Sequence, residues 1–160
     1  MNSKSAFKKC RDDKFAICSL DVEKGWIGIE PERLSYALYY YVLKGSSKFG
    51  VPFKEKYDVI KKGDFYCVKD KLYDHFIMEV LEDFCMIGFS TLDKEQDWDG
   101  RLIDEELLRV DAESILICLD GNPVVENQEL MMFDYGKIYP GHEYIVDTTD
   151  GVLGLFTMKV

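Results

Sequence analysis

The sequence has few histidines and an excess of acidic residues, and each feature excludes a class of function. Two histidines in 160 residues cannot supply the three imidazoles of a site for iron, nickel or zinc. With 20 basic against 30 acidic residues, direct nucleic-acid binding is not expected, because phosphate contacts need clustered lysine and arginine. No apolar run reaches the roughly 18 residues of a membrane span, so we expect no membrane insertion.

Several familiar sequence signals are also missing. Residues 1–11 contain no apolar stretch of the secretory kind. The five cysteines include no CxxC pair and no Cys/His pair with zinc spacing. We therefore expect reduced thiols and a cytoplasmic location. Phosphate-binding glycine loops, GxSxG and HExxH are absent as well, and we expect no cofactor.

What is present predicts a β-rich globular fold. Hydrophobic residues make up 47% and aromatic residues 14% of the chain, enough to form a core. Short segments rich in aromatic and β-branched residues alternate with turn signals such as Lys44-Gly45-Ser46 and Pro140-Gly141. This spacing is typical of a β-sandwich or jelly-roll.

The negative charge is concentrated in one block. Residues 74–113 contain 13 acidic and three basic residues, which equals the net charge of -10 of the whole chain. Within this block, Leu102–Val110 is the clearest helical candidate, because Ile103, Leu107 and Val110 would share one face. Asp99 is a plausible cap for that helix.

Four short blocks recur in the same order and indicate an internal duplication. Chance similarity of short apolar strands is the alternative. The matched blocks are Tyr40–Gly45 with Leu116–Gly121, Gly63–Tyr66 with Gly136–Tyr139, His75 with His142, and Met86–Thr91 with Val152–Thr157.

The order of these blocks resembles the cupin superfamily of small β-jelly-rolls. Gly136-Lys137-Ile138-Tyr139-Pro140-Gly141-His142 resembles the second cupin motif, and the second copy is similar to the carboxy-terminal cupin half of phosphomannose-isomerase-type proteins. We expect a mainly all-β fold of two fused cupin-like units, with one short helix in the connector. The expected segments are a basic N-terminal segment (1–13), unit 1 (14–92), an acidic connector (93–113) and unit 2 (114–160), which can pack as one compact domain.

The resemblance implies a metal site that this chain does not reproduce. Metal-dependent cupins use two His and a Glu before the Leu-x-Gly turn, and a later His. Leu38 and Ser114 stand at the two expected positions of that Glu, and no His lies in the segment directly before either turn. We therefore favour a non-catalytic protein. An isomerase or epimerase acting on a sugar phosphate or nucleotide sugar is the alternative.

Two groups of residues are candidates for binding. The first would line a ligand site and consists of Tyr39, Tyr41, Tyr66, His75, His142 and Tyr144. The second would form an acidic seam for a basic protein partner and consists of Asp93, Glu95, Asp97, Asp99, Asp104 and Glu105. For the histidines, the alternative is a hydrogen bond to a loop carbonyl; for the tyrosines, it is core packing.

Glu95–Glu106 also resembles an EF-hand loop, with oxygen-bearing side chains at alternate positions, Gly100 at the turn and Glu106 at the end. A solvated connector is the alternative, and calcium binding is the least favoured function. The sequence thus predicts a binding protein on a degenerate cupin scaffold, whose partner is a small molecule or a basic protein. Because many jelly-rolls pair through open sheets, we include a homodimer among the expected assemblies.

Overall fold

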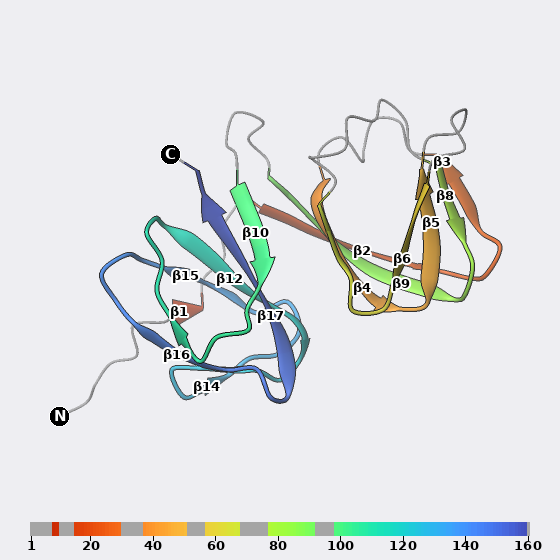
Figure 1. Cartoon of the computed structure of the whole chain (residues 1–160). Coiled ribbons are helices and arrows are strands. Elements are labelled where there is room, and N and C mark those ends of the chain that lie inside the picture. The colour runs from red at the N-terminus through yellow and green to blue at the C-terminus, as the bar shows by residue number, and fades with distance from the viewer. Residues whose placement is uncertain are drawn as a thin grey trace. The chain divides into compact units, whose positions relative to one another are not determined.

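Aromatic and branched side chains pack well on a pleated surface, and strands dominate the structure. The computed structural model describes residues 8–9, 15–29, 37–50, 57–67, 77–91 and 98–159. Within these residues every regular element is a β-strand, and all pairings are antiparallel (Figure 1). The prediction of an all-β fold is confirmed.

The chain divides into two compact units, and the first comprises Asp13–Lys94. It is a sandwich of two sheets around an apolar core that includes Tyr40, Phe49 and Phe84. One sheet has the order β2 (Phe15–Val22), β9 (Phe84–Thr91), β4 (Ala37–Lys44), β7 (Phe65–Cys67), and the other β3 (Ile27–Ile29), β8 (Ile77–Val80), β5 (Ser46–Gly50), β6 (Tyr57–Lys61).

The second unit comprises Met1–Asp12 and Glu95–Val160. It is also a sandwich, and its core includes Leu116, Tyr144 and Leu155. One sheet has the order β1 (Lys8–Lys9), β15 (Tyr135–Ile138), β12 (Ser114–Gly121), β17 (Gly151–Met158), β10 (Trp98–Leu102), and the other β11 (Leu107–Leu108), β16 (Tyr144–Asp147), β13 (Val124–Val125), β14 (Gln128–Glu129).

The two units repeat one strand plan. In the first unit β4 lies between β7 and β9, and in the second β12 lies between β15 and β17. Each central strand has an irregularity just before its end, between Val42 and Lys44 and between Cys118 and Asp120. Each strand then leads to a glycine with positive φ, Gly45 at 78° and Gly121 at 66°. The predicted match of Tyr40–Gly45 with Leu116–Gly121 therefore agrees with the strand pairing.

The predicted match of Gly63 with Gly136 is wrong. The register places Phe65 and Tyr135 at equivalent points beside the two central strands, so the counterpart of Gly63 is Phe133. A turn that contains glycine in the first unit thus corresponds to a turn without glycine in the second. Aligning the two glycines therefore paired the wrong residues.

The match of Met86–Thr91 with Val152–Thr157 is displaced by one residue. Strand pairing makes Ile87, and not Gly88, the counterpart of Gly154. Here too, aligning one glycine with another paired residues that are not equivalent in the two sheets.

The helix predicted for Leu102–Val110 is wrong. Trp98–Leu102 forms β10, which pairs with β17, and Leu107–Leu108 forms β11, which pairs with β16. Leu108 and Val110 are buried and Arg109 between them is exposed, which is the alternation of an extended chain. Backbone pairing with the sheets outweighed the helical spacing of the apolar residues.

Candidate functional site

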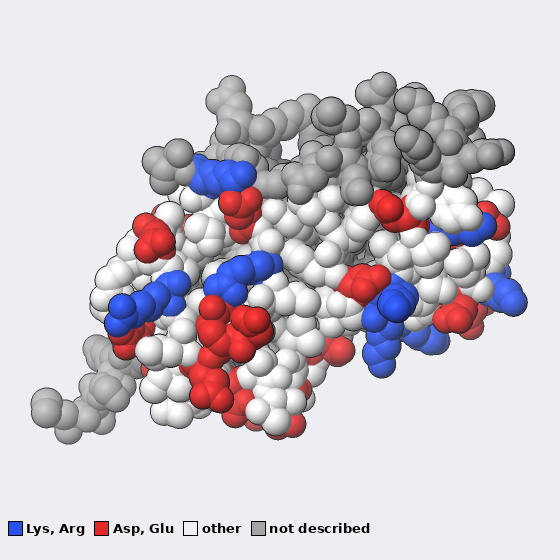
Figure 2. All heavy atoms as spheres, in the orientation of Figure 1, with Lys and Arg blue, Asp and Glu red and all other residues white. Residues whose placement is uncertain are grey.

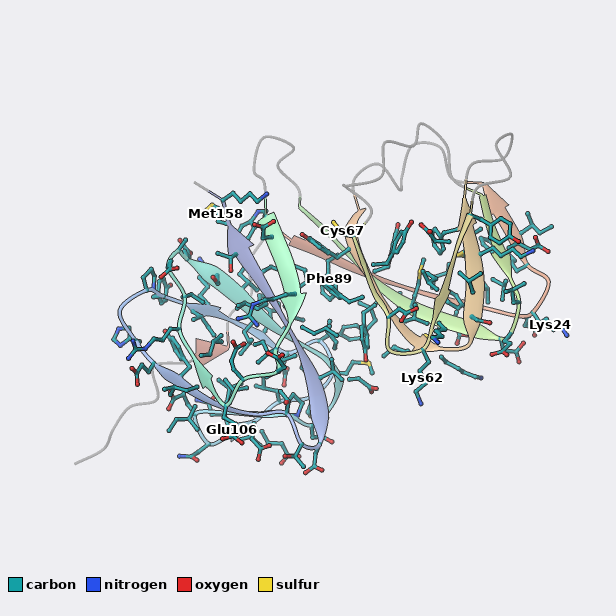
Figure 3. All side chains as sticks on the ribbon, viewed as in Figure 1. Lys24, Lys62, Cys67, Phe89, Glu106 and Met158 are labelled. Atoms are coloured by element: carbon teal, nitrogen blue, oxygen red, sulfur yellow. The ribbon has the colours of Figure 1, made fainter. Side chains whose placement is uncertain are left out.

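Tyr39 and Tyr41 lie on the face of their sheet opposite to the core residue Tyr40. Both are nevertheless buried, with 3% and 5% of their surface exposed. The ring of Tyr39 stacks on Phe65, with centroids 5.1 Å apart and planes 13° apart. Its cross-strand neighbours include Cys67 and Phe89, both labelled in Figure 3. A ligand would reach these rings only by displacing protein atoms.

Tyr66, another residue of the predicted ligand set, lines a groove. Its hydroxyl donates a hydrogen bond of 2.9 Å to Asp58 Oδ2, and its ring packs beside Phe49, with centroids 5.8 Å apart. A groove of about 550 Å³ lies here between β6 and β7. It is lined by Asp58, Val59, Ile60, Asp64, Phe65, Tyr66 and Cys67. Its polar groups are mainly hydrogen-bond acceptors, because two of the lining side chains are carboxylates.

His142 and Tyr144 have different surroundings. His142 is exposed and precedes β16, and its ring meets the Tyr144 ring edge-on at 6.3 Å. Tyr144 is fully buried in the core, and its hydroxyl oxygen accepts a hydrogen bond of 3.1 Å from the Tyr139 backbone N–H. The Tyr144 hydroxyl therefore anchors the turn between β15 and β16. His75 lies outside the described residues.

Apolar side chains fill the interiors of both sandwiches in the described part of the chain. Ser114, at the expected position of the cupin Glu, is buried. Its hydroxyl lies 2.9 Å from the Ala112 carbonyl oxygen and 2.9 Å from the Thr157 hydroxyl. Leu38 lies on β4, and its side chain is outside the described residues. Among the residues that the structure describes, no three His, Cys, Asp or Glu side chains gather as a metal site.

The Cys118 side chain belongs to the buried core of the second unit. Burial raises its pKa to about 11, although a hydrogen bond to the Asp120 carbonyl opposes the rise. The thiol is therefore protonated at neutral pH, and it behaves as a small hydrophobic core residue.

The acidic candidates are partly outside the described residues, namely Asp93, Glu95 and Asp97. Asp99 lies on β10, 3.2 Å from the Lys159 ammonium group. Asp104 and Glu105 lie in the loop between β10 and β11, where Glu105 contacts Arg101 at 2.6 Å. These three described residues belong to the second unit.

The EF-hand interpretation of Glu95–Glu106 is wrong in its described part. Gly100 would have to form the sharp turn of the calcium loop, but it lies within strand β10, opposite Phe156. The helix that should follow is also missing, because residues 103–106 form a loop and β11 comes next.

Several acidic residues that sequence analysis missed lie at the same end of the second unit as Asp104 and Glu105. The strands β10 and β12 end there, and β17 begins there. We define this acidic end as Asp104, Glu105, Glu106, Asp120, Asp147 and Asp150. Acidic side chains gather over the lower part of this unit in Figure 2, where Figure 3 labels Glu106. These loops lie far apart in the sequence, and the pairing of β10 and β12 with β17 brings them to one end of the unit.

Searches for related proteins found similarity at the level of structure. No family model matches the chain, and no curated protein matches it. No helix among the described residues is long and apolar enough to cross a membrane.

Two solved structures share the fold. A cupin 2 conserved barrel domain protein from Leptotrichia buccalis is 13% identical, with a TM-score of 0.51, and the match covers 99% of this chain and 92% of that chain. HutD from Pseudomonas fluorescens SBW25 is 12% identical, with a TM-score of 0.62, and the match covers 91% and 79%. At these identities the likeness concerns the fold alone. With two sandwiches that repeat one strand plan, this chain has a cupin-like fold.

Proposed function

We propose that this chain is a non-catalytic binding protein, located in the cytoplasm, whose second unit binds a basic protein partner at its acidic end. The observation that carries the proposal is the apolar character of the residues buried inside each sandwich, among those that the structure describes. Metal-dependent cupins bind their metal inside the barrel. Because apolar side chains supply no metal ligands, the surface is the better candidate for binding.

The electrostatics of the second unit support a basic partner. Between Trp98 and Lys159 there are 13 acidic and four basic residues. Each of the four basic side chains forms an ion pair within the same unit. The pairs are Arg101 with Glu105, Arg109 with Glu143, Lys137 with Glu113, and Lys159 with Asp99. A net negative charge remains on the other carboxylates, and such a field attracts a positively charged surface and speeds association with it.

Neutralising part of the acidic end should weaken binding of a basic probe. In the variant Asp104→Asn, Glu106→Gln, Asp150→Asn, we expect the affinity for a short lysine–serine peptide to fall about tenfold, since each exposed charge contact contributes about 0.5 kcal/mol. Isothermal titration at low and high salt measures this loss, which salt should reduce.

The matched control neutralises three exposed acids of the first unit: Asp21→Asn, Glu23→Gln, Glu82→Gln. It changes the net charge by the same amount and should leave peptide affinity within about twofold of the wild type. Equal losses of peptide affinity in both variants would mean that affinity depends only on the total charge of the protein. No loss of affinity in either variant would contradict the proposed site.

A second candidate function is binding of a small molecule in the groove beside Tyr66. The carboxylates of Asp58 and Asp64 favour a ligand that donates hydrogen bonds, such as an amine. We expect amine-bearing fragments to bind more strongly than carboxylate-bearing ones in a ligand-observed NMR screen. Tyr66→Phe should weaken them about fivefold, because it removes the hydrogen bond that orients Asp58.

The control for the groove is Tyr57→Phe, a tyrosine on the same strand as Asp58 that does not line the groove. It should leave fragment binding unchanged. Equal binding of amines and carboxylates, or equal loss in the two tyrosine variants, would count against this site. Native mass spectrometry of the same samples would also detect a homodimer.

The alternative of a sugar-phosphate isomerase or epimerase has less support. A phosphate group needs convergent cations, whereas the groove is lined by Asp58 and Asp64. Two residues of the predicted ligand set could act as acid or base, but they do not share a site: His142 is exposed, and Tyr144 is buried with its hydroxyl bonded to the Tyr139 backbone N–H.

A further inference from the structure

The same turn occurs in both units, but it exposes basic side chains in the first unit and apolar side chains in the second. In the first unit, Lys61 N–H donates to Asp64 Oδ2 at 2.9 Å, and Asp64 N–H donates back to the Lys61 carbonyl oxygen at 2.9 Å. Gly63 N–H donates to the Val42 carbonyl oxygen at 2.9 Å, and Val42 N–H donates to the Asp64 carbonyl oxygen at 3.0 Å. The turn therefore fixes the start of β7 against β4, and it exposes Lys61-Lys62-Gly63.

All four hydrogen bonds recur in the second unit. Met131 N–H donates to Asp134 Oδ2 at 2.8 Å, and Asp134 N–H donates to the Met131 carbonyl oxygen at 2.9 Å. Phe133 N–H donates to the Cys118 carbonyl oxygen at 2.9 Å, and Cys118 N–H donates to the Asp134 carbonyl oxygen at 2.8 Å. Here the turn exposes Met131-Met132-Phe133 in place of the two lysines and the glycine. The fold thus does not require these apolar residues, because the other copy makes the same turn without them.

The apolar turn also carries a conformational cost. Phe133 has a φ of 72°, while Gly63 in the equivalent place has a φ of 89°. A bulky residue in this region costs about 1–2 kcal/mol relative to its usual conformation. The side chains nevertheless remain exposed, by 66% for Met131, 40% for Met132 and 39% for Phe133. Three adjacent exposed apolar side chains, one of them strained, are typical of a contact surface.

Carboxylates adjoin this turn. Asp134 closes it. The Leu130 N–H donates to the Pro123 carbonyl oxygen, and the Asn122 side chain donates to the Leu130 carbonyl oxygen, so the turn adjoins the loop that follows β12. The Asn122 N–H donates to the Asp150 carbonyl oxygen at 2.8 Å, which connects the turn with the acidic end. An apolar patch bordered by negative charge complements a partner with apolar side chains next to basic ones.

We propose that Met131, Met132 and Phe133 form the apolar contact of a docking site for a segment of a partner protein in which apolar side chains alternate with lysine or arginine. This inference rests on the proposed function and specifies the partner of the same acidic end. Methionines suit such a contact, because their flexible thioethers adapt to different side chains.

The test compares two synthetic peptides of equal charge, one of leucine and lysine and one of serine and lysine. The wild-type chain should bind the leucine–lysine peptide at least about tenfold more tightly, the equivalent of one or two buried side chains. The variant Met131→Gln, Met132→Gln, Phe133→Gly should lose this advantage and keep its affinity for the serine–lysine peptide within about twofold. Because glycine occupies the equivalent place in the first unit, this variant should fold, and circular dichroism would verify that it does.

A matched control removes the same kind of surface elsewhere in the second unit. Leu107 and Ile145 form an exposed cross-strand pair, 51% and 64% exposed, and Leu107→Gln, Ile145→Gln should leave both peptide affinities unchanged. Unchanged binding in the turn variant, or equal losses in turn and control variants, would overturn the inference.

A different result would contradict the proposed function and not the apolar contact. The proposed function fails if the acidic-end variant keeps its affinity for the serine–lysine peptide, whatever the turn variant does. If the acidic-end variant loses that affinity while the turn variant still prefers leucine–lysine as the wild type does, the acidic end stands as the site and the apolar contact is wrong.

Discussion

Replacing Gly45 by alanine is expected to destabilise the first unit by more than about 3 kcal/mol. Its φ of 78° disfavours any side chain, and a Cβ there would overlap the Asp83 carbonyl oxygen. The second unit repeats the arrangement at Gly121, where a Cβ would overlap the Asp150 carbonyl oxygen. Because both obstacles are backbone atoms, the chain would have to shift at the end of the central strand, and Gly121→Ala should cost as much.

The variant Gly63→Ala separates the effect of positive φ from the effect of the overlap with a carbonyl oxygen. Gly63 has a φ of 89°, but nothing lies within 4 Å of the position of its Cβ. We expect a loss of only about 1 kcal/mol from backbone conformation. Urea unfolding followed by circular dichroism gives the free energies of unfolding of all three variants. Similar losses at Gly45 and Gly63 would show that the close approach to Asp83 contributes nothing.

Ser114→Glu should destabilise the second unit by more than about 4 kcal/mol and create no metal site. The substitution installs the residue that the cupin resemblance assigns to this position. Ser114 is fully buried, and its hydroxyl lies within hydrogen-bond distance of the Ala112 carbonyl and the Thr157 hydroxyl. A carboxylate here would lose its hydration and add volume at a fully buried position, and both effects oppose folding.

The control is Ser114→Ala, which removes the hydroxyl without adding volume or charge. Its cost should be about 1–2 kcal/mol, from the hydrogen bonds lost at two partly buried groups. Urea unfolding measures both variants, and elemental analysis after exposure to iron, nickel and zinc measures bound metal. A stable Ser114→Glu protein with stoichiometric metal would contradict the interpretation of the interior as a packed core.

The fold could be predicted largely because turns and apolar alternation are local signals. Lys44-Gly45-Ser46 indicates a turn from sequence, and the structure has the positive φ that makes glycine favourable there. The helix at Leu102–Val110 was predicted wrongly, because its apolar residues fit a helical face and only pairing with distant strands decides otherwise. Phe133 shows the converse, since a turn without glycine gives no sequence signal.

The candidate site could be predicted only in part, because exposure depends on tertiary packing. Tyr39 and Tyr144 are residue types that line ligand sites, but both are covered. Tyr66, from the same set, borders a groove. The acidic end includes Asp104, which was predicted, and Asp147 and Asp150, which were not. The loops that bring them together are adjacent through strand pairing and not through sequence.

The position of β1 has a consequence for the order of folding. Lys8 and Lys9 precede the first unit in the sequence, but they pair with Lys137 and Gly136. A ribosome therefore produces all of Asp13–Lys94 before it produces β15. The first unit can fold during synthesis as an uninterrupted stretch of chain, while the two earlier residues have no strand to pair with. The five-stranded sheet is completed last, by joining the start of the chain to a late segment, and β1 then covers an edge of β15 that would otherwise be open to another strand.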